Sequence, residues 1–192
     1  MNDFDDPAIV PWRTTARETL IDDRWLTLHA DTCVTDDGAT IAPFYVTDYP
    51  DWVLIVAIDD ADNLLMIEQY RHARGIVSLE LPGGGVDASD ANLLAAARRE
   101  LLEETGCVAD TWEMIASLSP NPAIHTNRCH AVLARGTRCI ASPQEEPSER
   151  VRRQWVPIAD VVRRAMAGEV QQAVHVAALA IVLGRMNRWS PA

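Results

Sequence analysis

Three closely spaced glutamates in the middle of the chain are of a residue type that can bind a metal cation. Glu100, Glu103 and Glu104 are three and four residues apart, so on an α-helix their carboxylates converge on one side. Like charges at this spacing repel one another and destabilise the helix unless positive charge lies among them. The adjacent Arg99 can neutralise only part of this charge. Hard divalent cations bind carboxylate oxygens together with substrate phosphates, so the helix predicts a metal site for a phosphate compound.

A glycine-rich loop comes before this helix. Pro82 is followed by three glycines, residues 83–85, and a backbone without side chains can approach a ligand closely. The loop and the helix together predict a cradle for a metal and a diphosphate. A glutamate-rich helix face is usually only solvated, so a scaffold protein whose acidic helix binds no metal is the alternative that these residues leave open.

The chain predicts a small β-rich domain followed by a larger mixed domain. Residues 1–50 hold short β-like pieces around the hairpin signal Asp37-Gly38, and Pro50-Asp51 is the candidate boundary before a domain at 51–192. The expected strands are 25–29, 32–35, 40–46, 52–58, 64–70, 130–134 and 151–156, and the expected helices are 90–105, 158–167 and 171–183. Ser89 or Asp90 is expected to cap the first helix, and Gly106 to end it. This order predicts a mixed sheet flanked by helices.

Composition argues against several classes of partner. The chain has 17 basic and 28 acidic residues and a net charge of −11, which disfavours nucleic-acid binding. The longest apolar run, residues 174–184, is too short to span a bilayer, so no membrane partner is expected. The acidic N-terminus lacks the features of a secretion signal, and we expect a cytoplasmic protein. The four cysteines have no CxxC spacing and are expected to be small buried or half-buried thiols.

Residues 85–107 resemble the Nudix box, G-x5-E-x7-R-E-U-x-E-E-x-G-U, in which U is a bulky apolar residue. The matching residues are Gly85, Arg99, Glu100, Leu101, Glu103, Glu104 and Gly106, and Cys107 stands at the last apolar position. One position departs from the pattern, because residue 91 is alanine where the box has its first glutamate. A one-residue insertion in the loop would let Asp90 serve instead.

The resemblance extends beyond the box. Gln69-Tyr70-Arg71-His72 and the segment 78–84 are similar to the segments that precede the box in ADP-ribose pyrophosphatases and other Nudix enzymes of nucleotide sugars. The N-terminal hairpin region is similar to the small β-domain of these enzymes. The segment Asn121–Asn127 differs from the usual ADP-ribose version of that loop, so the substrate stays open.

The resemblance implies both a fold and an activity. It implies an α/β (α+β) Nudix fold, in which a mixed β-sheet lies between helices and a small antiparallel β-domain precedes it. It implies Mg²⁺-dependent cleavage of a small nucleoside diphosphate derivative to a nucleoside monophosphate and a phosphorylated product. ADP-ribose or another nucleotide sugar is the leading candidate substrate. It also implies a homodimer. A Nudix-like module that binds a nucleotide and regulates another protein is the alternative.

The resemblance assigns roles to individual residues. Glu100 and Glu104 would ligate Mg²⁺, for which Mn²⁺ can substitute, and Glu103 would complete or bridge the site. Glu103 and Arg99, together with Glu149, are the candidate catalytic residues. The carbonyl of Gly84, or of Gly83, is a further candidate ligand. The general base is expected in the loop before the last strand, with Glu149 as first choice and Glu146 and Glu145 as alternatives. The candidate substrate-binding residues are Arg71 as a phosphate clamp, Glu80, which would hold a metal-bound water or orient Arg71, and Trp52 and Trp25 as stacking surfaces for the base.

These substrate-binding and base assignments compete with ordinary structural roles. A single glutamate in a polar loop is more often solvated, and a lone tryptophan usually packs in a core. Arg71 could be a plain surface arginine, and Glu80 could equally be a structural partner at a strand end. His72, His125 and His130 lack zinc spacing and are expected to be ordinary residues.

Overall fold

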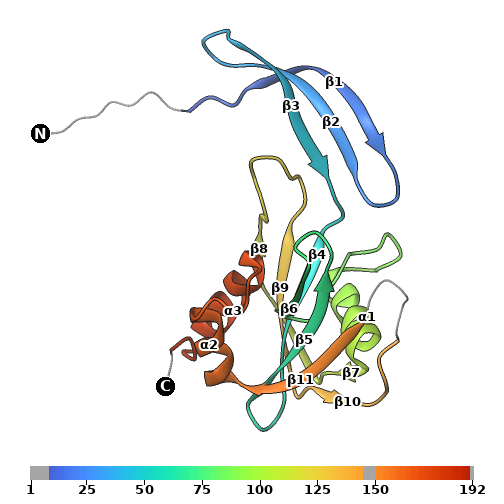
Figure 1. The fold of residues 1–192 in the computed structure, drawn as a ribbon, viewed down its shortest axis with the longest axis vertical. Coiled ribbons are helices and arrows are strands. Elements are labelled where there is room, and N and C mark those ends of the chain that lie inside the picture. The colour runs from blue at the N-terminus through green and yellow to red at the C-terminus, as the bar shows by residue number, and fades with distance from the viewer. Residues whose placement is uncertain (1–8, 145–149, 191–192) are drawn as a thin grey trace, which may run out of the picture. The chain divides into compact units, whose positions relative to one another are not determined.

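The computed structural model describes residues 9–144 and 150–190. The chain divides into two compact units. The first consists of Met1–Tyr49 with Asn121–Thr126, and the second of Pro50–Pro120 with Asn127–Ala192. Figure 1 labels the helices and strands of both units.

The first unit is built on a three-stranded antiparallel sheet. Its strands β1 (Arg13–Asp22), β2 (Thr27–Val34) and β3 (Thr40–Asp48) lie in that order. The two strands expected at 25–29 and 32–35 form the single strand β2, whose pairing with β3 is shifted between Asp31 and Cys33. The sequence did not predict β1, because its residues are mostly polar and all of them are exposed, so no apolar alternation marks it.

The second unit contains a mixed sheet of six strands. The strand order is β11-β5-β4-β9-β8, and β6 pairs with β5. The bounds are β4 Trp52–Ile58, β5 Asn63–Arg71, β6 Ile76–Glu80, β8 Thr111–Leu118, β9 Cys129–Arg135 and β11 Val151–Pro157. Strands β4 and β9 are parallel and the other pairs are antiparallel. A separate small sheet joins β7 (Cys107–Val108) to β10 (Arg138–Cys139).

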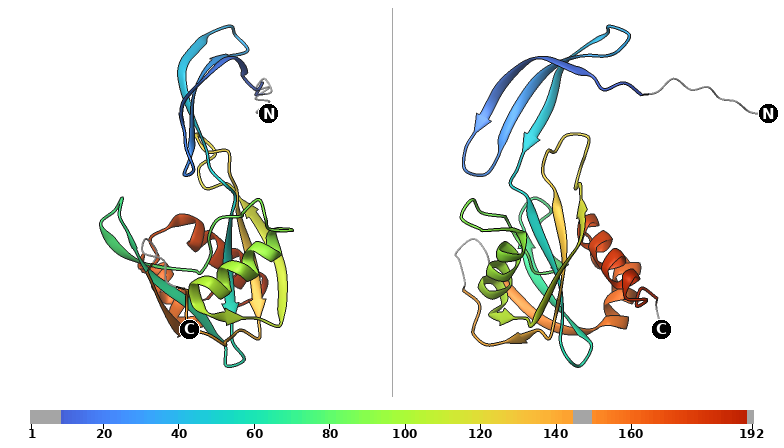
Figure 2. Two further views of the ribbon diagram at one scale, coloured as in Figure 1. Left: turned by 90° about the vertical axis from the view of Figure 1, so that its right-hand side faces the viewer. Right: turned by 180° about the vertical axis from the view of Figure 1, so that it is seen from behind.

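Helices cover both faces of this mixed sheet. Figures 1 and 2 show α1 (Leu93–Thr105) on one face and α2 (Ile158–Met166) with α3 (Ala173–Arg185) on the other. Alternate residues of β4 serve the two layers. Val53 and Ile55 pack with Leu101 of α1, whereas Leu54 and Val56 belong to the core formed with α2 and α3. The predicted mixed sheet between helices, with an antiparallel N-terminal sheet, is therefore confirmed.

Two strands of the mixed sheet were missed for physical reasons. β8 lies at the edge of the sheet and alternates between exposed and partly buried residues, so its apolar signal is weak. β6 is short and follows directly on the turn after β5.

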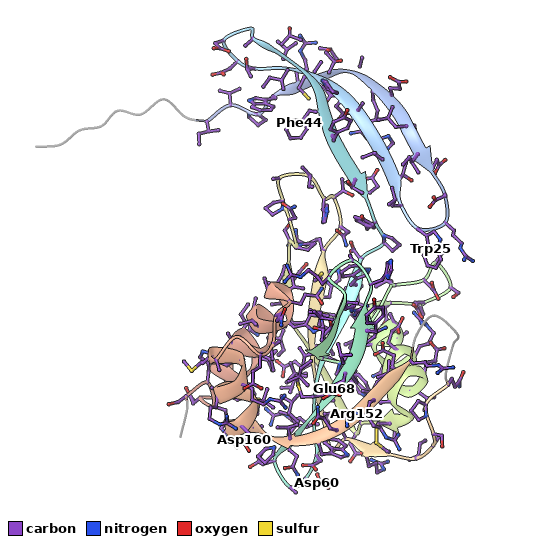
Figure 3. The ribbon with its side chains drawn as sticks, viewed as in Figure 1. Trp25, Phe44, Asp60, Glu68, Arg152 and Asp160 are labelled. Carbon is purple, nitrogen blue, oxygen red and sulfur yellow. A yellow bond between two sulfur atoms is a disulfide. The ribbon has the colours of Figure 1, made fainter. Side chains whose placement is uncertain are left out.

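Cross-strand ion pairs also connect the strands of this sheet, for example Glu68 of β5 with Arg152 of β11 at 2.8 Å, both labelled in Figure 3. Within residues 9–144 and 150–190, no helix is long and apolar enough to cross a membrane.

Candidate active site

The helix α1 carries the three glutamates and is closed at both ends by specific residues. The side chain of Asn92 caps its first turn by accepting the hydrogen bond of Ala95 N–H at 3.0 Å. The expected caps, Ser89 and Asp90, are wrong, because the helix begins later and the Asp90 carboxylate binds other groups. Gly106 ends the helix at φ 66°, a left-handed conformation that favours glycine, as predicted.

Arg99 lies at the centre of an ion-pair network on this helix. Its Nη2 donates to the Asp90 carboxylate at 2.8 Å and to the Gly85 carbonyl at 2.9 Å. Its Nη1 donates to Glu100 at 2.9 Å and to Glu103 at 3.0 Å. The hydrogen bond with Asp90 is the main cause that raises the pKa of Arg99, against the opposing effect of burial. The guanidinium therefore stays charged and neutralises part of the carboxylate charge.

Asp90 supplies the acidic partner that Ala91 cannot supply. Its carboxylate accepts hydrogen bonds from Arg99 and from the backbone N–H of Asp87, at 2.8 and 2.9 Å. These two interactions, the one with Arg99 first, lower the pKa of Asp90. Arg99 thus has a carboxylate partner although residue 91 is alanine, because Asp90, one residue earlier in the chain, provides it.

The glycine loop lies directly against two of the glutamates. Gly83 N–H donates to Glu104 Oε2 at 2.8 Å. The φ of Gly83 is 150°, and a Cβ atom there would lie 2.0 Å from the carbonyl oxygen of Val53, so only glycine fits. A Cβ atom on Gly84 would lie 2.6 Å from Glu100 Oε2. The fold therefore brings a bare backbone segment against the carboxylates of Glu100 and Glu104.

The carbonyl groups of Gly83 and Gly84 have different surroundings. The Gly84 carbonyl accepts a hydrogen bond from Val53 N–H at 2.9 Å, which joins the loop to β4. Within the part of the chain that the structure describes, the Gly83 carbonyl accepts no hydrogen bond. An acceptor with no protein donor is the kind of group that a cation or water satisfies.

The atoms gathered here fit a hard divalent cation. Glu104 is only 7% exposed, and its carboxylate and that of Glu100 lie against the glycine loop, so oxygen atoms of both the helix and the loop are available as ligands. The Glu103 side chain is 42% exposed and is held by Arg99. Among residues 9–144 and 150–190, no group of three or more His, Cys, Asp or Glu side chains is arranged to hold a metal ion. Two carboxylates and a backbone carbonyl are the donors that fit.

Arg71 and Glu80 form a buried ion pair just before the glycine loop. Arg71 Nε and Nη2 donate to the two oxygens of Glu80 at 3.0 and 2.6 Å, so the pairing is bidentate. Burial opposes the charged form of Glu80, whose side chain is 1% exposed, but the hydrogen bonds from Arg71 and nearby positive charge hold its pKa below the ordinary value. Arg71 and Glu80 are thus paired in the structure, and the role of Glu80 in substrate binding stays a prediction.

One residue next to this pair was not predicted from the sequence. His175, on α3, accepts the hydrogen bond of Leu81 N–H at its Nδ1 at 2.9 Å, and its Nε2 faces Glu80 Oε2 at 3.7 Å. A lone histidine in an apolar helix has no spacing signal, so the sequence offered no way to single it out.

Two family models match the chain. The model of the NUDIX domain matches residues 48–177, and the model of the nucleoside diphosphate sugar hydrolase N-terminal domain matches residues 12–47. The chain belongs to the Nudix family.

Relatives with known names support this membership. An ADP-ribose pyrophosphatase of Mycobacterium tuberculosis is 33% identical over 89% of this chain and 83% of its own length. A CMP-5'-(N-acetyl-N-hydroxy-3-aminopropyl)phosphonate hydrolase of Streptomyces rubellomurinus is 26% identical over 90% of this chain and 82% of its own length. The crystal structure of an ADP compounds hydrolase has the same fold, with a TM-score of 0.81 at 23% identity over 94% of this chain and 98% of that chain. This Nudix chain is a hydrolase that acts on diphosphate bonds.

The two candidate tryptophans of this Nudix chain have different surroundings. Trp52 is partly buried, packs against the core of the second unit and forms a bridge with Gly85 of the glycine loop. Trp25, labelled in Figure 3, lies in the turn between β1 and β2 of the first unit and is 64% exposed. The guanidinium of Arg24 lies 4.3 Å from the centre of its ring, a cation–π contact.

The candidate general base of this Nudix chain, Glu149, lies outside the described residues, as do the alternatives Glu145 and Glu146. The residue directly before this segment contacts α1, because Gln144 N–H donates to the Glu103 carbonyl at 2.8 Å.

The expectation that all four cysteines are thiols is wrong for two of them. Cys107, directly after the box glycine Gly106, forms a disulfide with Cys139. The antiparallel pairing of β7 with β10 sets these two residues opposite each other, which the sequence spacing of 32 residues could not reveal. Cys33 and Cys129 are buried free thiols, as expected.

Proposed function

We propose that this Nudix hydrolase cleaves ADP-ribose or another nucleotide sugar into a nucleoside monophosphate and a phosphorylated product, with Mg²⁺ as cofactor and Mn²⁺ able to substitute. The observation that carries the proposal is the placement of the buried Glu104 and of Glu100 against the bare backbone of Gly83 and Gly84. The names of the relatives and of the N-terminal domain family, which refer to ADP-ribose and to nucleoside diphosphate sugars, favour this substrate class.

Three protein groups would hold the cation. Glu100 and Glu104 provide carboxylate oxygens, and of the two loop carbonyls that of Gly83 is the better ligand, because the Gly84 carbonyl already accepts Val53 N–H. Glu103 would complete or bridge the site. When bound, a divalent cation would neutralise the charge of the diphosphate and acidify the attacking water.

Arg99 would keep the carboxylates in place. Its bonds to Asp90 and to the Gly85 carbonyl tie the helix to the loop, and its bonds to Glu100 and Glu103 reduce the repulsion between them. Arg99 therefore acts on the reaction through Glu100 and Glu103.

Arg71 would bind a phosphate of the substrate. Glu80 fixes the plane of its guanidinium through Nε and Nη2, which reduces the conformational entropy that binding a phosphate would cost. Trp52 is one candidate for stacking on the base, supported by its bridge to the glycine loop, and Trp25 of the first unit is the other candidate, supported by its exposed ring. Glu149 would accept the proton of the attacking water.

The first unit, which corresponds to the expected domain at 1–50, would form a homodimer interface and contribute to substrate binding. Every residue of β1 is exposed in the single chain, and Trp12, Leu20 and Ile21 are large apolar residues exposed by 44–48%. We take these side chains as the candidate contact surface, because large contiguous apolar patches mark protein–protein interfaces. Light scattering at micromolar protein concentration tests this, and a monomer would contradict it.

The cytoplasm is the proposed location. Disulfides are rare in reducing compartments, so the bond between Cys107 and Cys139 makes the location worth measuring directly. Cell fractionation followed by immunoblotting measures where the protein accumulates. Recovery of most of the protein outside the cytoplasmic fraction would contradict the proposal.

A panel of substrates with product analysis tests the proposed activity. ADP-ribose, ADP-glucose, GDP-mannose, NADH and a dinucleoside polyphosphate are incubated with the protein in Mg²⁺, in Mn²⁺ and in excess chelator. We expect cation-dependent release of the nucleoside monophosphate, and incorporation of ¹⁸O from labelled water identifies the phosphorus attacked. Nucleotide binding without turnover of any substrate would instead favour a regulatory module.

Removal of one carboxylate tests the metal assignment within that assay. Glu104→Gln keeps the shape of the side chain but removes a charged ligand, so we expect the turnover number to fall by about 10² or more with an unchanged melting temperature. Glu113→Gln, at an exposed glutamate of β8, is the matched control and should retain full activity. If Glu104→Gln turned over substrate at the wild-type rate, the assignment of α1 to the metal site would be contradicted.

A further inference from the structure

Leu81 lies at the point where the chain changes its pairing partner. The last residue of β6 that pairs with β5 is Glu80, opposite Ile67. Two residues further on, the chain pairs with β4 instead, because the Pro82 carbonyl accepts a hydrogen bond from Ile55 N–H at 2.9 Å. The N–H of Leu81 lies between these two ladders and is buried, so it needs an acceptor from elsewhere in the protein.

His175, on the C-terminal helix α3, supplies this acceptor. Its Nδ1 accepts the Leu81 N–H at 2.9 Å, across a separation of 94 residues. Nδ1 must therefore carry no proton, which places the ring proton on Nε2. Burial lowers the pKa of His175 to about 4, partly offset by the carboxylate of Glu80, so the imidazole is neutral and keeps this role at neutral pH.

The same imidazole also faces the carboxylate that holds Arg71. Its Nε2 lies 3.7 Å from Glu80 Oε2, the oxygen that accepts Nη2 of Arg71 at 2.6 Å. The side chains of His175 and Glu80 are 4% and 1% exposed, so water has little access to replace either one. One ring thus contacts both the strand that leads into the glycine loop and the ion pair next to it.

Several hydrogen bonds fix the backbone of the segment after Leu81. The Pro82 and Gly84 carbonyls bond to β4, and Gly83 N–H bonds to Glu104 of α1. These bonds come from the sheet and from the α1 face, whereas His175 belongs to α3, which covers the other face. The imidazole therefore gives the α3 layer a directional hydrogen bond to the entry of the loop, in addition to apolar packing around Leu81.

We propose that His175 is a positioning residue, which fixes the Leu81–Gly84 segment and the Glu80–Arg71 pair for substrate and cation binding. This role rests on the proposed function, because it concerns the same loop and the same arginine. His175 touches neither the substrate nor the reacting atoms and acts through Leu81 N–H and Glu80.

Three variants separate this role from simple packing. His175→Leu fills similar volume but offers no acceptor to Leu81 N–H. His175→Asn places its Oδ1 at the position of Nδ1 and can accept that hydrogen bond. Val174→Ala, at the neighbouring buried residue of α3, is the matched control for lost packing.

The first readout is independent of activity. Amide hydrogen exchange of ¹⁵N-labelled protein should show that Leu81 N–H exchanges at least about tenfold faster in His175→Leu than in the wild type or in His175→Asn, because a buried hydrogen bond is lost. Mn²⁺ affinity, measured by electron paramagnetic resonance, should fall in His175→Leu and recover in His175→Asn. In Val174→Ala both quantities should match the wild type. Unchanged exchange and unchanged Mn²⁺ affinity in His175→Leu would overturn the proposal.

The second readout is the kinetics of whichever substrate the panel identifies. At equal folded fraction, kcat/KM should fall about tenfold or more in His175→Leu, while Val174→Ala keeps the wild-type value. Equal losses in both variants, or no recovery in His175→Asn, would show that His175 only fills space. If the wild type hydrolyses no substrate, the proposed function fails, whereas the exchange and Mn²⁺ measurements still decide whether His175 positions the loop.

Discussion

Replacing Gly83 by alanine should destabilise the second unit, whereas the same replacement two residues later should be tolerated. Gly83 has a φ of 150°, and a Cβ atom there would lie 2.0 Å from the Val53 carbonyl oxygen, a backbone atom that cannot rotate away. A Cβ atom on Gly85 would meet no heavy atom within 4 Å. The two glycines of one loop therefore form a test and its internal control.

The size of the effect follows from the two ways in which the loop can respond. A non-glycine residue kept in this backbone region costs about 1–3 kcal/mol before the clash is counted. If the loop moves instead, it loses the hydrogen bonds of Gly84 to Val53, of Pro82 to Ile55 and of Gly83 to Glu104. At about 0.5–1.5 kcal/mol each, three lost bonds cost about 2–4 kcal/mol.

Thermal unfolding followed by circular dichroism measures this cost. For a chain of this size, about 2–4 kcal/mol corresponds to a melting temperature roughly 5–15 °C lower for Gly83→Ala. Gly85→Ala should stay within about 0.5 kcal/mol of the wild type, because nothing in the structure opposes its methyl group. A melting temperature of Gly83→Ala equal to that of Gly85→Ala would refute the steric argument and the described path of the loop.

Two further predictions concern the neighbours of this loop. In Gly84→Ala the new methyl group would meet the end of the flexible Glu100 side chain at 2.6 Å, so the protein should fold with nearly the wild-type melting temperature but bind Mn²⁺ more weakly, as calorimetry can measure. The wild-type affinity would contradict the placement of Glu100 against the loop. The disulfide of Cys107 with Cys139 closes a loop of 32 residues, and the chain-entropy relation assigns it about 3–4 kcal/mol. A phosphine reductant should therefore lower the urea midpoint of the wild type but not that of the double variant Cys107→Ser/Cys139→Ser, and equal shifts in both would show that the bond does not form.

The sequence determined the elements whose signal is local. The 3.6-residue period places Glu100 and Glu104 one turn apart, so their convergence follows from helix geometry alone, and the Glu-rich α1 is where the pattern predicted it. The apolar β-branched run of β4 likewise predicted a strand buried on both faces. Strands with weaker apolar patterns, such as β1 and β8, were missed because exposed residues dominate them.

Only the tertiary structure decided how distant residues meet. The switch of the chain from β5 to β4 fixes the path of the glycine loop, and with it the contact of Gly83 with Glu104. Leu81 and His175 are 94 residues apart, and Cys107 and Cys139 are 32 apart, so no local period links either pair. A side chain's own helix or strand fixes its direction, whereas its partner depends on how the layers pack, and that information is spread over the whole core.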